Sequence, residues 1–133
     1  MQHPGTPGCD PQHAAAVTGN VIPLLHEIRH ALSALLEEGR ETTIDLRSLP
    51  LGPGEEDEIE QLLGCGEVRV ELSALGPSEI VETRYPGVWI VTHHNTDGAV
   101  IGRFIEICLV PQLVAAQTAD IHAGLAELNA RLN

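Results

Sequence analysis

Between residues 67 and 110, segments typical of β-strands follow one another with only short turns between them. Apolar and polar side chains alternate in the first segment, which indicates a strand with one buried and one solvated face. Tyr85-Pro86-Gly87 and Asp97-Gly98 are typical of turns and hairpins. The segments are residues 67–72, 78–84, 88–94 and 100–110. Short turns between them predict a mostly antiparallel sheet.

Helical spacing marks three other parts of the chain. From Val21 to Leu36 apolar side chains form one broad face, with Asn20 placed to cap the helix and Gly39 to end it. Residues 55–63 indicate a short helix whose four leading acids lie where the helix dipole favours negative charge. Pro111 is expected to end the last strand and open a final helix.

These elements predict an α+β fold: a mostly antiparallel four-stranded sheet with helices packed on one face, in a single two-layer domain. Residues 42–46 also read as a strand. The Pro- and Gly-rich residues 1–19 predict a flexible arm, and residues 20–133 one domain. In the final helix an apolar seam leaves two outcomes open, packing on the sheet or a homodimer. The seam is Ile121, Leu125, Leu128 and Leu132.

The charge of the chain narrows the class of partner. Its formal net charge is −12, and all seven basic residues are Arg. A phosphate backbone or an anionic membrane surface would repel such a chain, whereas a basic patch on another protein would attract it. We therefore expect a protein partner, no nucleic acid and no membrane insertion.

Cysteine usage and hydropathy indicate the compartment. Cys9, Cys65 and Cys108 are odd in number and widely spaced, which argues against a disulfide framework and for a reducing environment. The N-terminus lacks the pattern of a secretory signal, and no apolar run is long enough to span a membrane. We expect a cytoplasmic location.

His26-Glu27-Ile28-Arg29-His30 matches the H-E-x-x-H pattern of zinc proteases. On the first helix, however, His26 and His30 would each lie roughly 160° from the apolar face centred on Ile28. Both are expected to face solvent, whereas a protease site needs a walled cleft. Incidental metal binding by this pair remains open.

Other metal candidates are Cys65 and the pair His93 and His94. Adjacent strand residues point to opposite faces, so the two histidines do not readily share one metal. Cys65 lies between two glycines at a helix C-terminus, where a thiol is better explained as a small apolar side chain in a turn. The chain contains no G-x-S-x-G, P-loop, dinucleotide or C-x-x-C motif. We expect no enzymatic activity and no cofactor.

Four stretches, with Pro111 after them, resemble the HupH/HyaF family of accessory proteins from nickel–iron hydrogenase operons. They are residues 44–51, 63–68, 80–89 and 104–107. The resemblance implies a maturation role: contact with a hydrogenase subunit or another accessory protein during cofactor assembly or before export. Two alternatives are a metal-handling or cofactor-scaffold protein that uses Cys and His ligands, and a small metalloprotease.

The resemblance also implies a set of partner-binding residues. They are Gly64, Gly66, Glu67, Glu82, Thr83, Pro86, Gly87, Val88, Trp89 and Glu106. The glutamates are expected to form an acidic strip. Trp89 has two interpretations, an interface anchor or the largest core residue in a chain with only three aromatic side chains.

Overall fold

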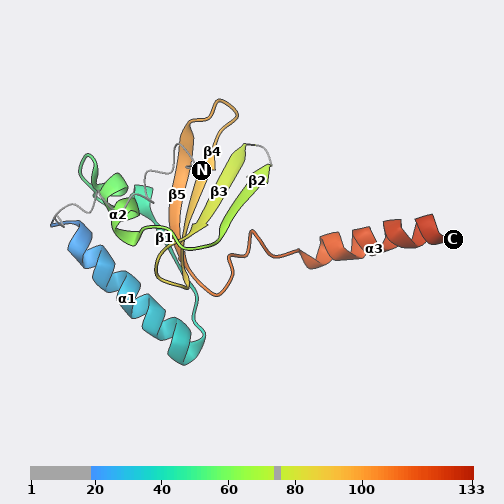
Figure 1. Cartoon of the computed structure of the whole chain (residues 1–133), viewed down its shortest axis with the longest axis horizontal. Coiled ribbons are helices and arrows are strands. Elements are labelled where there is room, and N and C mark those ends of the chain that lie inside the picture. Colours follow the sequence, from blue (N-terminus) through green and yellow to red (C-terminus); the bar gives the residue numbers. More distant parts are fainter. Residues whose placement is uncertain (1–18, 74–75) are drawn as a thin grey trace.

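A computed structural model describes residues 19–73 and 76–133 of the chain (Figure 1). The elements are α1 (Val21–Glu38), β1 (Thr42–Asp45), the 3-10 helix η3 (Leu46–Ser48), α2 (Glu55–Leu63), β2 (Arg69–Ser73), β3 (Pro77–Glu82), β4 (Val88–His94), β5 (Val100–Ile107) and α3 (Thr118–Leu132). The predicted α+β class is confirmed. The predicted arm, residues 1–19, lies outside the described residues except for Gly19.

All five described strands form one antiparallel sheet, in the order β1-β5-β4-β3-β2. Strands β2 to β5 form the meander that the short turns predict. The prediction of four strands is wrong by one, because β1 joins the edge of this meander and pairs Ile44 with Ile105. Turn signals do not report such a pairing, since the two strands lie far apart in sequence.

Helices α1 and α2 cover one face of the sheet, on the left in Figure 1. Ile28 of α1 and Ile59 of α2 pack with Ile90 and Ile105 of the sheet in a cluster whose buried residues are all aliphatic. This confirms the prediction of helices on one face. Leu36 does not share in the core, because its side chain is 87% exposed at the end of α1.

A second apolar cluster lies on the other side of the alternating strands. Its buried residues are Ile80, Trp89, Val91 and Cys108, and Phe104 packs partly buried against them. Strand alternation explains the division, since Val88 and Ile90 point to the helices whereas Trp89 and Val91 point away. The aromatic side chains Trp89 and Phe104 are therefore gathered in this second cluster.

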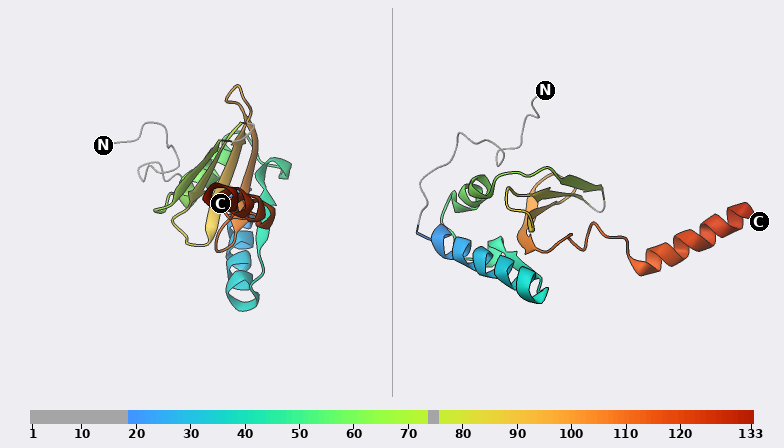
Figure 2. Two further views of the ribbon diagram at one scale, coloured as in Figure 1. Left: turned by 90° about the vertical axis from the view of Figure 1, so that its right-hand side faces the viewer. Right: turned by 60° about the horizontal axis from the view of Figure 1, so that its bottom comes forward.

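The C-terminal part departs from prediction. β5 ends at Ile107, and α3 begins only at Thr118. Pro111 does not open the helix: it is buried, and its carbonyl accepts a hydrogen bond from the Val114 N–H in a turn. α3 extends away from the sheet, as the right-hand view of Figure 2 shows, and has no buried residue. Among the described residues, no helix is long and apolar enough to cross a membrane.

Candidate functional site

The Gly64-Cys65-Gly66 segment joins α2 to the sheet by close backbone contacts. Gly64 ends α2 with a φ of +66°, a conformation that favours glycine. The Gly66 N–H donates to the Glu82 carbonyl at 2.6 Å, and a Cβ on Gly66 would lie 2.6 Å from the Thr83 carbonyl oxygen. Both glycines therefore have a structural reason to be glycine, whether or not a partner contacts them.

The turn between β3 and β4 is held together from within. The Val88 N–H donates to the Tyr85 carbonyl at 2.9 Å, and Gly87 has a φ of +93°. Thr83 is 1% exposed, and its hydroxyl oxygen accepts a hydrogen bond from the Tyr85 N–H at 3.1 Å. Val88 is fully buried, so within this turn Arg84, Tyr85 and Pro86 are the side chains that reach solvent.

Trp89 is a core residue of the described chain. It is 6% exposed, and its indole N–H donates to the Cys108 carbonyl oxygen at 3.1 Å. Its large apolar surface and its one donor are thus both used internally. Of the two interpretations from the sequence, the structure supports the core role.

Two of the candidate glutamates flank Trp89 on neighbouring strands. Glu82 of β3 and Glu106 of β5 are its cross-strand partners, and residues directly opposite one another share a face of the sheet. Both glutamates are partly buried. Glu67 is exposed, precedes β2 and lies outside this row. The sequence predicted an acidic strip of three glutamates. The structure shows only two of them, Glu82 and Glu106, in one row, with Trp89 between them.

A hollow of about 580 Å³ opens beside Glu106, where β1 and β5 end and the segment toward α3 passes. Its lining residues are Glu41, Thr42, Thr43, Glu106, Ile107, Cys108, Gln112, Leu113, Ala115, Ala116, Gln117 and Asp120. We call this space the acidic hollow, because three carboxyl groups line it and no basic side chain does. Such a lining suits a cationic group or a hydrogen-bond donor.

Electrostatics within the acidic hollow follow from burial. Burial raises the pKa of the Glu106 carboxyl; His93 opposes that rise and Glu41 adds to it. Burial also raises the pKa of the Cys108 thiol to about 11, and the Glu106 and Glu41 carboxylates contribute in the same direction. Cys108 is therefore a protonated thiol at neutral pH and a poor nucleophile.

Replacing Glu106 with glutamine should flatten the dependence of stability on pH. A carboxyl whose pKa is raised by folding stabilises the fold below its unfolded value, here 4.5, and this contribution is lost as pH rises through the folded pKa. Urea unfolding between about pH 4 and about pH 7 measures the effect. Wild type should lose stability relative to Glu106→Gln as pH rises. If the difference in stability between wild type and Glu106→Gln stayed constant across this range, the raised pKa of Glu106 would be contradicted. Glu37→Gln, on the exposed side of α1, is the control.

The metal candidates are not brought together. His26 and His30 are exposed on α1, as predicted, and the His26 ring contacts the Arg29 guanidinium at 2.9 Å. His93 pairs with the Ser78 hydroxyl at 2.7 Å, and His94 with the Pro77 carbonyl at 3.3 Å. No group of three or more His, Cys, Asp or Glu side chains among residues 19–73 and 76–133 is placed to hold a metal ion.

Cys65 is disulfide-bonded and presents no free thiol. The argument against a disulfide framework, drawn from the number and spacing of the cysteines, therefore does not hold at this residue. Cys108 is a free, buried cysteine.

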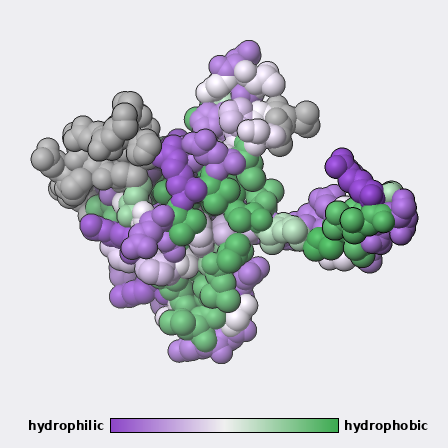
Figure 3. All heavy atoms as spheres, turned by 45° about the vertical axis from the view of Figure 1, so that its right-hand side comes forward, coloured by the Kyte–Doolittle hydropathy of each residue, from purple (hydrophilic) through white to green (hydrophobic). Residues whose placement is uncertain are grey.

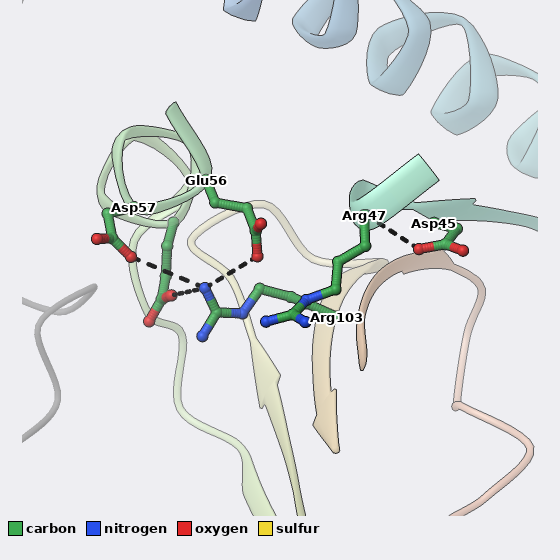
Figure 4. Close-up of polar contacts among 6 residues, drawn as sticks. Asp45, Arg47, Glu56, Asp57 and Arg103 are labelled. Carbon is green, nitrogen blue, oxygen red and sulfur yellow. Dashed lines mark hydrogen bonds and ion pairs between the residues drawn. The ribbon is translucent and has the colours of Figure 1, made fainter. Parts of the chain in front are cut away.

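The sequence did not reveal how the acids of α2 are used. Arg103 of β5 reaches Glu56, Asp57 and Glu60 at 3.4, 3.8 and 3.5 Å (Figure 4). Asn20 does not cap α1 with its side chain; its amide donates instead to the Glu55 carboxylate at 2.9 Å. The dipole explanation was thus incomplete, since these acids also attach α2 to the sheet and to α1.

Comparison with known proteins identifies the family. The model of the HupH hydrogenase expression protein, C-terminal conserved region, matches residues 18–133. The chain belongs to the HupH family. This confirms the resemblance drawn from the four stretches of sequence.

HupH relatives are similar over much of this chain. A hydrogenase expression/formation protein HupH from Rhizobium leguminosarum bv. viciae is 26% identical over 118 residues, which are 87% of this chain and 42% of that protein. HoxQ from Azotobacter vinelandii is 32% identical over 93 residues, 70% of this chain and 32% of that protein. The chain thus spans less than half the length of these relatives.

A solved structure supports the fold. The hydrogenase expression protein HupH from Thiobacillus denitrificans ATCC 25259 has a TM-score of 0.82 and 48% identity. The match covers 88% of this chain and 98% of that one.

Proposed function

We propose that this HupH-family chain is an accessory protein of nickel–iron hydrogenase maturation, which binds a hydrogenase subunit or another maturation protein and catalyses no reaction. The relatives are named hydrogenase expression/formation proteins, and these names support a role in the hydrogenase system. The acidic hollow is the observation that supports binding. Its carboxylates and amides suit a basic or hydrogen-bond-donating segment of a partner, presented during cofactor assembly or before export.

Several of the predicted partner-binding residues stabilise the fold, and those that are buried are not accessible to a partner. Thr83, Val88 and Trp89 are buried, and Gly66 permits a close backbone approach. We therefore assign recognition to the accessible carboxylates of the hollow, above all Glu41 and Glu106, and leave the exposed Glu67 and Pro86 as secondary candidates. The buried residues hold the strands that carry these groups.

Co-purification from cells that express a nickel–iron hydrogenase operon tests the proposal. The tagged wild-type chain should enrich a hydrogenase subunit or a maturation protein, and Glu41→Gln/Glu106→Gln should lower recovery about tenfold, since close charge pairs dominate such contacts. Glu27→Gln/Glu37→Gln removes the same charge from the exposed face of α1 and should leave recovery unchanged. If the wild-type chain enriched no hydrogenase subunit and no maturation protein, the proposed function would be wrong. If the two double variants recovered the partner equally well, the acidic hollow would be excluded as the binding site.

A further inference from the structure

Helix α3 presents an uncovered apolar seam. Its residues Ile121, Leu125, Leu128 and Leu132 are 56%, 55%, 55% and 77% exposed. Figure 3 shows hydrophobic side chains gathered on the projecting α3, away from the body of the molecule. Soluble monomers rarely expose a contiguous stripe of large apolar side chains, so the seam marks an interaction surface.

The length of α3 also indicates that it needs a partner. Isolated helices of about 15 residues are marginal in water, and helices in proteins are stabilised mainly by packing of an apolar face. α3 has 15 residues, includes Gly124, and has no buried residue. Within the described part of the chain, nothing supplies that packing.

We infer that α3 pairs antiparallel with α3 of a second copy of this chain, about a two-fold axis. The spacing of the seam is self-complementary. An axis between residues 126 and 127 sets Leu125 against Leu128 of the second copy and Ile121 against Leu132. Every large apolar side chain of the seam then meets another one, in the isologous contact typical of homodimers.

Charge selects the antiparallel arrangement. Asp120 lies in the first turn of α3 and Arg131 in its last turn. Eleven residues separate them, which is close to three full turns, so they flank the seam on the same side. Antiparallel pairing brings Asp120 beside Arg131 of the second copy and opposes the two helix dipoles. Parallel pairing would instead bring like ends together.

The same arrangement keeps two acidic bodies apart. α3 contributes two acids and one Arg, a net charge of 1 − 2 = −1, to the −12 of the chain. Because α3 extends away from the sheet, antiparallel pairing places the two bodies at opposite ends of a helix pair roughly 22 Å long. The contact thus uses a helix that carries little of the net charge, which limits repulsion between the two copies.

Sedimentation velocity on the full chain tests the pairing. Wild type should form a dimer as its concentration rises from about 1 to about 100 µM, and Leu125→Asp/Leu128→Asp should weaken association at least about 100-fold. Ala123→Asp/Ala130→Asp adds the same charge opposite the seam and should still dimerise. Since both pairs lie on the exposed α3, circular dichroism should show an unchanged sheet. A monomeric wild type at the highest concentration, or a seam variant that still dimerises, would overturn the inference.

A charge swap tests the orientation. Asp120→Arg should weaken the dimer about threefold or more, because it faces Arg131 of the second copy with a like charge. Adding Arg131→Asp should restore the affinity. Failure of the double swap to restore it would overturn the antiparallel geometry. These measurements contain no hydrogenase component, so their outcome is independent of the proposed function.

Discussion

Replacing Trp89 with alanine should lower the free energy of unfolding by about 3–5 kcal/mol, the usual cost of removing a large buried aromatic side chain. Trp89 is 6% exposed between Ile80, Val91 and Cys108, so little solvent can refill its place. The Cys108 carbonyl would also lose its indole donor. Urea unfolding followed by far-ultraviolet circular dichroism measures the loss; fluorescence does not serve, because the chain has one Trp.

Two further variants separate the contributions at this position. Trp89→Phe keeps most of the apolar volume and removes the hydrogen bond, and should cost about 1–2 kcal/mol. Tyr85→Ala removes a 45% exposed aromatic residue in the adjacent turn and should cost less than about 1 kcal/mol. If Trp89→Ala were as mild as Tyr85→Ala, the core assignment would be wrong and the interface interpretation would return.

Arg103→Met should destabilise the fold by about 2–3 kcal/mol at neutral pH. The Arg103 side chain is 15% exposed and faces three of the carboxylates of α2, which would be left close together without this cation. Removing one partner of a buried ion pair costs about 3–5 kcal/mol, and the exposure of Asp57 reduces the figure here. Urea unfolding at neutral pH gives the value.

The pH dependence of this variant gives an independent check. Burial raises the pKa of Glu60, and Arg103 opposes that rise. Without Arg103 the pKa of Glu60 should rise further, so protonation relieves the repulsion, and the penalty should shrink as pH falls toward the unfolded value of 4.5. Arg69→Met breaks more exposed pairs with Glu71 and Glu79 and should cost less than about 1 kcal/mol. Equal penalties for the two variants would contradict the role of Arg103.

Local sequence patterns predicted the elements they encode directly. α1, α2 and β4 lie where helical spacing, glycine stops and turn residues indicated, because each signal acts within a few residues. The start of α3 was misplaced, because Pro111 is compatible with a helix start but also with the buried turn that it makes. The β1–β5 pairing was missed because it depends on which edge remains free after the meander forms.

In the candidate site, too, local sequence predicted some features, and others depend on how distant segments pack. Motif resemblance selected Glu82, Glu106 and Trp89, and the strand register does bring these three together. Their burial, and hence the structural role of Trp89, could not be predicted from one sequence. Glu41 and Asp120 were missed because they reach the acidic hollow through the β1–β5 pairing and the path of the chain into α3.

Asp120 lies at a junction in the molecule, since it lines the acidic hollow and also opens α3. A ligand in the hollow and a second copy on α3 would therefore compete for, or jointly fix, the same carboxylate. Thermodynamic linkage then requires reciprocity: whatever factor a bound partner imposes on self-association, self-association imposes on partner affinity. Partner binding and dimer assembly would then be coupled equilibria, and the apparent affinity of each would depend on how far the other has proceeded.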